Sequence, residues 1–337
     1  MAIAQSKSLQ AYNSFGVQAS AAFFTSIANR NDLEEALSYA QQENLPIQVL
    51  GSGSNVLLIR DFPGLVVHIG NQGVEWLESA SAEFERVRVA AGENWHNFVS
   101  TCLNKNLYGL ENLALIPGTV GAAPIQNIGA YGAEIANYFV ELTAYDREEN
   151  RWLSMDKSQC EFAYRDSVFK SGGRGRYIVI DVTLELSKQW EPNLSYQALT
   201  ERLKDTEPNP QTVFETVCSI RREKLPDPAE LGNAGSFFKN PTISQEKYAA
   251  LSEQLPGLPN FDIEEEGLTK IPAAWLLDKL GWKGRSRGRA KVHNNHALVL
   301  VNPGEASGED ILLLAQEMSS SVLEKFGIAL EPEVQIL

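Results

Sequence analysis

A short glycine-rich segment is the first place where this sequence could do chemistry. Residues 51–55 read Gly-Ser-Gly-Ser-Asn and lie between two apolar runs that have the pattern of strands. Glycines let backbone N–H groups approach a ligand closely, and successive amides in a tight turn form an anion nest, which suits a pyrophosphate. A plain hairpin turn is the alternative, because the third glycine and the following helix of a dinucleotide-binding fingerprint are missing.

A second segment, residues 117–132, is unusually rich in glycine and alanine. It offers few large side chains to pack and much accessible backbone, which favours the lining of a flat, bulky ligand with main-chain amides and carbonyls. Long loops without secondary structure of their own are uncommon unless they are functional. A well-packed structural loop is the alternative interpretation.

Three single residues could carry acid, base or anion-binding chemistry. Ser236 could be a nucleophile, a proton donor or a turn residue, although Phe238 stands where a G-x-S-x-G elbow needs glycine, which disfavours a serine hydrolase. Arg165 could hold a carboxylate with its planar fork, and a protonated Glu333 could donate a hydrogen bond. By themselves, a salt-bridged arginine and a solvated glutamate are the more ordinary interpretations of the last two.

Alternating apolar patterns predict the elements that must position these residues. Helical spacing is expected over residues 31–43, with Asn31 and Glu34 as a capping box, and from Trp95 onward with Asn94 as the cap. His96 is expected on the solvated face of that second helix. Further helices are predicted over 213–224, 272–280 and 311–326, and strands over 46–50, 56–59, 65–69, 86–90, 138–145, 177–186 and 297–301. The irregular alternation predicts an α+β fold with mixed sheets.

Composition limits the class of protein. The 337 residues include 29 Lys and Arg against 43 Asp and Glu, a formal net charge of −14, which argues against broad nucleic-acid binding. Three separated cysteines and no Cys/His cluster predict neither a metal site nor a disulfide framework. We expect no membrane span, since the longest uncharged stretch, 112–133, is broken by prolines and glycines. No signal peptide is recognised, so a cytoplasmic protein is expected.

Five motifs together resemble the UDP-N-acetylenolpyruvoylglucosamine reductases, flavoenzymes of bacterial peptidoglycan synthesis. They occur in the order of that family and span almost the whole chain: Gly51–Asn55, Ile116–Gly121 with Gln126–Tyr131, Tyr164–Ser167, Asn233–Pro241 and Leu330–Val334. Residues 195–198, Ser-Tyr-Gln-Ala, are similar to the longer type of the family, in which a tyrosine loop folds over the substrate.

The resemblance implies a two-part FAD-binding fold of the vanillyl-alcohol-oxidase type and a C-terminal α+β substrate domain. The implied borders are 1–76 and 77–224 for the two FAD-binding parts, 225–326 for the substrate domain, and 327–337 for a segment that carries Glu333 back to the active site. FAD would be bound non-covalently, its pyrophosphate by the first loop and its flavin by the second. The implied cofactor residues are Gly51, Ser52, Gly53, Ser54, Asn55, Pro117, Gly118, Thr119, Gly121, Ala122, Gln126, Asn127, Gly129, Ala130 and Tyr131.

The resemblance also implies the reaction, in which NADPH reduces the flavin and the flavin reduces the enolpyruvyl group of UDP-N-acetylglucosamine enolpyruvate. Ser236 would be the proton donor, with Arg165 and Glu333 stabilising the developing charge. Substrate would be bound by Tyr164, Tyr196, Lys224 and Asn240. His296 departs from a glutamine that some relatives carry, which would make its contribution depend on pH.

The expected protein is a monomer that takes part in cell-wall biogenesis, cell shape and cell division and that binds neither nucleic acid nor membrane. Two rivals remain, another FAD oxidoreductase of the same fold and a flavin-free nucleotide-sugar binding protein. A run of five cations between Lys283 and Lys291, with no acid among them, predicts local attraction of anionic ligands, against a plain solvated basic loop.

Overall fold

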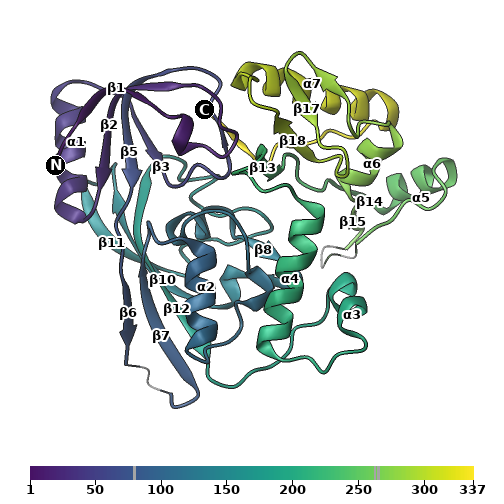
Figure 1. The fold of residues 1–337 in the computed structure, drawn as a ribbon, viewed down its shortest axis with the longest axis horizontal. Coiled ribbons are helices and arrows are strands. Elements are labelled where there is room, and N and C mark those ends of the chain that lie inside the picture. The colour runs from purple at the N-terminus through teal and green to yellow at the C-terminus, as the bar shows by residue number, and fades with distance from the viewer. Residues whose placement is uncertain (79–80, 262, 264–265) are drawn as a thin grey trace. The chain divides into compact units, whose positions relative to one another are not determined.

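The computed structural model describes residues 1–337 apart from 79–80, 262 and 264–265 (Figure 1). The chain forms two compact units, and each draws on more than one stretch of sequence. The first unit contains Met1–Lys7, Ala21–Gly53 and Phe62–Glu223, and the second contains Ser8–Ser20, Ser54–Asp61 and Lys224–Leu337. The first glycine-rich segment is therefore divided, with Gly53 ending a stretch of the first unit and Ser54 beginning one of the second.

One sheet of the first unit is largely parallel. Its order is β1 (Ala4–Ser8), β2 (Ser20–Ile27), β5 (Phe62–Ile69) and β3 (Ile47–Leu50), with β2 and β3 parallel to β5. The residues at 65–67 of β5 are fully buried, as expected for a central parallel strand. Helix α1 (Arg30–Gln42) follows β2 and buries Leu33, Ala36 and Ala40. The predicted capping box is wrong by two residues, because Asn29 caps the helix by accepting from the Asp32 N–H (3.0 Å).

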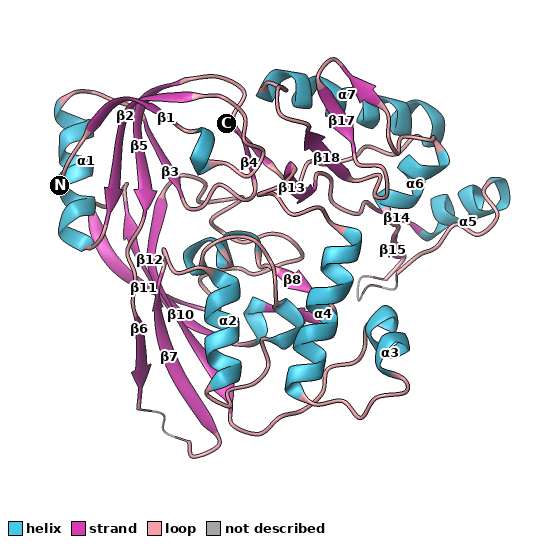
Figure 2. Ribbon diagram, viewed as in Figure 1, coloured by secondary structure: helices cyan, strands magenta, loops and turns pink. Residues whose placement is uncertain are grey.

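The second sheet of this unit, whose strands are drawn in magenta in Figure 2, is antiparallel. Its order is β11 (Arg151–Asp156), β10 (Phe139–Asp146), β12 (Tyr177–Ser187), β7 (Phe84–Ala90) and β6 (Val74–Leu77). In the central strand β12, Val182 lies opposite Leu142 on one side and Val89 on the other. Helices α2 (Trp95–Asn104) and α4 (Pro210–Lys224) bury their apolar faces in the same core cluster as this sheet, and α3 (Gln197–Leu203) adds Leu199 and Leu203.

The connection from α2 to β10 contains the second glycine-rich segment and has secondary structure of its own. Short 3-10 turns and two-residue strands divide it: η2 (Glu111–Leu113), η3 (Val120–Ala122), η4 (Pro124–Gln126), β8 (Gly129–Ala130), β9 (Ala133–Glu134) and η5 (Ile135–Asn137). Two non-glycine residues of the segment, Asn127 and Tyr131, lie in the left-handed region, with φ of +44° and +49°. The segment is therefore a folded wall of small residues.

The second unit is built on an antiparallel sheet with the order β13 (Gly232–Ser236), β18 (Val299–Asn302), β17 (Ala290–Val292) and β16 (Ser286–Arg287). Helix α7 (Gly308–Phe326) follows a Ser307 capping box and begins three residues before the predicted start at residue 311. It ends at Gly327, whose φ is +64°, as the sequence predicts. The remaining elements are η1 (Gln10–Tyr12), α5 (Gln245–Gln254), α6 (Ala273–Lys279), the pair β14 (Thr242–Ser244) and β15 (Leu268–Lys270), and the parallel pair β4 (Val56–Leu57) and β19 (Gln335–Ile336).

The mixture of parallel and antiparallel sheets with helices confirms the predicted α+β class. The predicted helices are all present, and the strand expected over 56–59 is limited to Val56–Leu57. Short elements such as α3, α5 and β14 were missed; α5 buries only Leu251 and β14 only Ile243, so neither shows a clear apolar period. Within the part of the chain described, no helix is both long and apolar enough to cross a membrane.

Candidate functional site

The first glycine-rich segment lies between β3 and β4, as expected, and its first residue packs against the second segment. A Cβ built on Gly51 would lie 3.0 Å from Thr119 Oγ1 and 4.0 Å from the Cβ of Ala122. The structure thus brings together cofactor candidates that are far apart in the sequence. Gly53 has φ of +65°, a left-handed turn in which a side chain would be strained.

Backbone hydrogen bonds attach the second segment to the turn between β7 and α2. The Gly118 carbonyl accepts from the Trp95 N–H (3.1 Å), and the Gly121 N–H donates to the Ala91 carbonyl (2.9 Å). A Cβ at Gly121 would lie 2.3 Å from that of Ala91, closer than real Cβ atoms come. Glycine at position 121 is therefore a packing requirement of the loop.

Two cofactor candidates use their side chains inside the protein. Asn127 is buried, and its Nδ2 donates to Glu134 Oε2 (2.8 Å) and the Ala163 carbonyl (3.1 Å) while its Oδ1 accepts from the Ala136 N–H (3.2 Å). Gln126 Oε1 accepts from Lys170 Nζ (3.4 Å). These side chains shape the loop, so any direct contact that Asn127 makes with a cofactor would come from its backbone.

The tight turn that carries Tyr164 and Arg165 is fixed against the second segment. Ala163 and Asp166 exchange backbone hydrogen bonds across the turn (3.1 and 3.2 Å), and Ser167 Oγ donates to the Ile125 carbonyl (2.6 Å). Arg165 has φ of +54°, and its Nη2 donates to the Gly129 carbonyl (2.6 Å). The guanidinium also lies over the Tyr164 ring, 5.7 Å from its centroid. The predicted catalytic arginine and the predicted flavin loop are thus in direct contact.

Arg221 is a residue of this site that sequence reasoning missed. Its Nε donates to the Leu115 carbonyl (3.0 Å), and burial lowers the pKa of its guanidinium while nearby Tyr131 opposes that shift. Burial raises the pKa of Tyr131, and Arg221 is the largest influence in the other direction. The sequence does contain a feature that could have identified Arg221. It follows Val213 and Val217 at four-residue spacing, which places a cation on the apolar face of α4.

His96 is not the solvated side chain that was expected. Its Nδ1 accepts from the Leu115 N–H (3.0 Å), and its ring stacks on Phe214 of α4 with centroids 5.4 Å apart. Burial lowers the pKa of His96, and the cations of Arg222 and Arg221 add to the effect. Helix α4 covers this face of α2, a packing that the local pattern around residue 96 does not contain. Leu115, in the left-handed region at φ +58°, is consequently held at both its N–H and its carbonyl.

In the second unit, Ser236 ends strand β13 and follows Gly235, whose φ is +70°. The Gly235 N–H donates to Oδ1 of buried Asn233 (2.9 Å), and Asn233 Nδ2 donates to the carbonyls of Pro226 (3.1 Å) and Leu231 (2.8 Å). On the other side, the Phe237 N–H donates to the Leu298 carbonyl (2.8 Å). The backbone on both sides of Ser236 is therefore fixed.

The C-terminal segment returns to lie beside this strand. The Glu333 N–H donates to the Phe237 carbonyl (2.8 Å), and the Lys239 N–H donates to the Glu331 carbonyl (2.9 Å). Asn55, from the first glycine-rich segment, donates through Nδ2 to the Glu333 carbonyl (3.2 Å). The two proton-transfer candidates, Ser236 and Glu333, thus stand on neighbouring backbone segments, next to a cofactor candidate.

The remaining substrate candidates have separate environments. Tyr196 is 41% exposed and meets the Tyr131 ring edge to face (5.1 Å, 81°) in the first unit. In the second unit Lys224 is exposed, and Asn240 Oδ1 accepts from the Ala273 N–H (3.0 Å) at the start of α6. His296 Nδ1 accepts from the Leu298 N–H (3.3 Å); burial lowers the pKa of His296 to about 4, and His293, Lys224 and Lys283 contribute.

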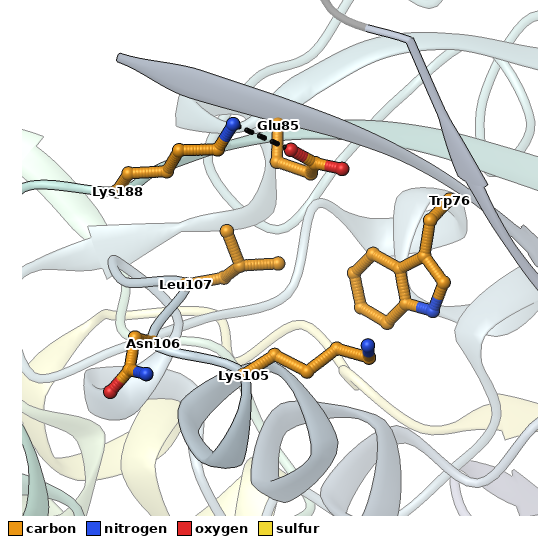
Figure 3. A pocket seen from close by; sticks show the side chains of 6 residues that line it. All are labelled: Trp76, Glu85, Lys105, Asn106, Leu107 and Lys188. Atoms are coloured by element: carbon orange, nitrogen blue, oxygen red, sulfur yellow. Dashed lines mark ion pairs between the residues drawn. The ribbon is translucent and has the colours of Figure 1, made fainter. Parts of the chain in front are cut away.

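Two features of the surface lie outside this arrangement. In the basic run, Lys283 pairs with Asp278 (2.9 Å) and Arg287 with Glu317 (3.0 Å), so acids from α6 and α7 offset part of its charge. An open hollow of about 480 Å³ is lined by none of the candidate residues (Figure 3). Its lining consists of Trp76, Glu85, Lys105, Asn106, Leu107 and Lys188.

Within the first unit, residues 51–53 and 117–132 suit an FAD, because they combine small residues, left-handed turns and a close approach of the backbone at Gly51 and Thr119. Residues 21–152 match the FAD binding domain model, and residues 227–337 match the model of the UDP-N-acetylenolpyruvoylglucosamine reductase C-terminal domain. The chain is therefore an FAD-binding oxidoreductase, with the FAD-binding fold expected from its motifs followed by a separate α+β part.

Relatives along the full chain identify its family. A UDP-N-acetylenolpyruvoylglucosamine reductase of Pseudomonas putida is 44% identical, with 97% of this chain and 96% of the relative covered. One from Burkholderia multivorans is 46% identical over 96% of this chain and 94% of the relative. A crystal structure of the reductase from Thermus caldophilus has the same fold, with a TM-score of 0.68, 23% identity, and coverage of 99% and 98%. The chain belongs to the UDP-N-acetylenolpyruvoylglucosamine reductase family.

Proposed function

We propose that this enzyme reduces the enolpyruvyl group of UDP-N-acetylglucosamine enolpyruvate to give UDP-N-acetylmuramate, a peptidoglycan precursor. Bound FAD would supply the redox chemistry, taking a hydride from NADPH and passing it from N5 to the enolpyruvyl double bond. This choice of substrate is supported by 44–46% identity, along nearly the whole chain, to proteins named UDP-N-acetylenolpyruvoylglucosamine reductase. A cytoplasmic monomer, with domain borders near residues 76 and 225, is part of the same proposal.

Ser236 is the proton donor in this proposal. Hydride addition at one carbon leaves enolate character on the neighbouring carbon, which then needs a proton from a group held within hydrogen-bond reach. The single observation that carries the assignment is the hydrogen bond from the Glu333 N–H to the Phe237 carbonyl (2.8 Å), since it holds the backbone of Glu333 beside the residue that follows Ser236. Glu333, when protonated, would stabilise the enolate oxygen or share proton delivery.

The other candidates bind and orient. Arg165 would hold the substrate carboxylate, because its planar guanidinium matches a carboxylate fork. Tyr196, Lys224 and Asn240 would bind the diphosphate and sugar, and Tyr164 would lie near the substrate or nicotinamide. A mobile point charge such as Lys224 suits a diphosphate. The FAD pyrophosphate would be held by residues 51–55 and the flavin by residues 117–131.

The test separates the two halves of the reaction. Under anaerobic conditions NADPH should bleach the flavin, and the enolpyruvyl sugar nucleotide should then restore its absorbance. In Ser236→Ala the bleaching should remain normal, whereas the return should slow by about 10²–10⁴-fold, the usual contribution of a proton donor. Ser252→Ala, which removes an exposed hydroxyl of α5 that donates to the Ala249 carbonyl, is the control and should match the wild type.

Other outcomes point to the rivals. Colourless protein that binds the sugar nucleotide would support a flavin-free binding protein. A flavin that NADPH reduces but the enolpyruvyl sugar nucleotide does not reoxidise would support another FAD oxidoreductase. Normal turnover in Ser236→Ala would remove that serine from the mechanism.

A further inference from the structure

A buried asparagine of the first unit joins the flavin loop to the segment that carries Tyr196. Asn112 is 3% exposed and lies in η2. Its Nδ2 donates both to the Tyr131 carbonyl (2.7 Å) and to the Asn193 carbonyl (2.8 Å). A side-chain amide has two N–H donors, so one group here serves two different chain segments.

Asn193 completes the connection from the other side. Its Nδ2 donates to the Gly132 carbonyl (2.9 Å), and its Oδ1 accepts from the Ser195 hydroxyl (2.8 Å). Gly132 has φ of +85°, and a Cβ there would lie 2.2 Å from Ser195 Oγ. A side chain at position 132 would therefore require the Ser195 hydroxyl to move and would be strained by the left-handed backbone. We call the hydrogen bonds of Asn112 and Asn193 to residues 131, 132 and 193 the asparagine clasp.

The clasp fixes the residues next to two aromatic rings. Tyr131 and Tyr196 meet edge to face, 5.1 Å apart, directly beside the clasped backbone. From Tyr196 the chain continues into α3, whose first turn includes a hydrogen bond from the Leu199 N–H to the Tyr196 carbonyl (2.9 Å). The position of the exposed Tyr196 ring thus depends on a loop of the candidate flavin site.

We propose that Asn112 is a positioning residue that couples the substrate segment to the flavin loop. The identities of the two ligands rest on the proposed function; the coupling rests on the contacts of the clasp. Removing the amide would leave two part-buried carbonyls without this donor, which disfavours the clasped arrangement. Since coupling between two sites is reciprocal, loosening the clasp should weaken binding of the sugar nucleotide and also retention of FAD.

The experiment compares Asn112→Ala and Asn112→Asp holoenzymes with the wild type. Aspartate keeps the size of the side chain but, when ionised, offers only acceptors to two carbonyls. Amide hydrogen exchange in residues 193–203 should become faster in both variants. The KM for the enolpyruvyl sugar nucleotide should rise about tenfold, the equivalent of a typical hydrogen bond, with a smaller change in the KM for NADPH.

Two further variants make the result decisive. Asn29→Ala removes the α1 cap, a comparable hydrogen bond of another asparagine, and should leave exchange in 193–203 and the KM ratio unchanged. Asn193→Ala removes the other half of the clasp at a less buried position. In the double variant, the rise in the sugar-nucleotide KM should be smaller than the two single effects combined, because both substitutions break the same clasp. This second site keeps the test available if Asn112 variants do not fold.

Unchanged exchange in residues 193–203, or an equal rise of both KM values, would overturn the proposal. A wild-type holoenzyme that does not turn over the enolpyruvyl sugar nucleotide would instead refute the proposed function, and the exchange measurement would still test the clasp.

Discussion

The candidate residues of the two units are held in place in opposite ways. In the first unit, the two glycine-rich segments pack closely because glycine has no side chain. Gly121 lies against Ala91, and Gly51 lies against Thr119. In the second unit, the proposed proton-transfer residues Ser236 and Glu333 lie on backbone segments that are held together by main-chain hydrogen bonds. A glycine-rich segment can therefore be recognised from its local composition. A pair such as Ser236 and Glu333 cannot, because it forms only through contacts between distant segments.

The largest effect is expected when a side chain is added to the second glycine-rich segment. In Gly121→Val, the new Cβ would start 2.3 Å from the Ala91 Cβ, so the loop must move. Overpacking of this kind typically lowers the free energy of unfolding by about 1–3 kcal/mol. We expect the purified variant to lose most of its FAD, as measured by the ratio of flavin to protein absorbance, and to unfold at lower denaturant concentration.

Gly172→Val is the matched control, because a Cβ at position 172 meets nothing within 4 Å. It should retain FAD like the wild type. A Gly121→Val protein with full flavin content would show that the loop can shift at little cost, and the contrast between the two parts of the site would then disappear.

The second prediction concerns Arg165, whose side chain contacts the second glycine-rich segment. Arg165→Lys keeps a cation near the Gly129 carbonyl but loses the planar fork. Flavin reduction by NADPH should be nearly normal, while reoxidation by the enolpyruvyl sugar nucleotide should slow by roughly 10²-fold, as for the loss of one charge-stabilising donor. Stopped-flow absorbance of each half-reaction measures the two rates.

Arg147→Lys provides the control for this substitution. Arg147 Nη1 donates to the Gly175 carbonyl (2.7 Å), a comparable arginine–carbonyl contact outside the candidate site. Equal slowing of both half-reactions in Arg165→Lys would mean that the arginine supports the flavin loop only and does not hold the substrate.

The same contrast explains how much the sequence could predict. The glycine-rich segments, the cap at Asn94 and the end of α7 at Gly327 were all recognised, because each depends on neighbouring residues. The roles of His96, Arg221 and Asn112 were not, since each is set by a partner from a distant segment. The predicted roles of Ser236, Glu333 and the other site residues came from the family resemblance and stay predictions.

A smaller effect is expected at Asn240, where two substitutions should separate a role in stability from a role in binding the sugar nucleotide. Its Oδ1 accepts from the Ala273 N–H (3.0 Å), so Asn240→Ala should lower the free energy of unfolding by about 1 kcal/mol, as for a lost helix cap. Asn240→Asp keeps this acceptor, and a carboxylate is favourable near a helix N-terminus, so stability should be retained. Both variants should raise the KM for the sugar nucleotide, by loss of the amide or by repulsion of its diphosphate.

Urea unfolding and steady-state kinetics measure these two roles separately. A sugar-nucleotide KM that is normal in Asn240→Asp and raised only in the less stable alanine variant would assign Asn240 a structural role alone. The second unit would then contain one fewer functional side chain than we propose.

The smallest effect is a dependence of stability on pH that originates in the second unit. Burial lowers the pKa of His296 from 6.5 to about 4, helped by His293, Lys224 and Lys283, so the folded state favours the neutral ring. The unfolded chain then binds more protons between these two pH values. The contribution of His296 is therefore complete above pH 6.5 and is lost as the pH falls toward 4.

His296→Gln should make the melting temperature less sensitive to acid over that interval and leave it nearly unchanged above the interval. Glutamine keeps an acceptor within reach of the Leu298 N–H but has no proton to gain. His68→Gln is the comparison from the first unit, where burial also lowers the histidine pKa but neighbouring cations are not among the causes. The larger change is expected in His296→Gln, because His296 is more deeply buried than His68 and also has Lys224 and Lys283 nearby. An acid sensitivity of His296→Gln equal to that of the wild type would contradict the lowered pKa of His296.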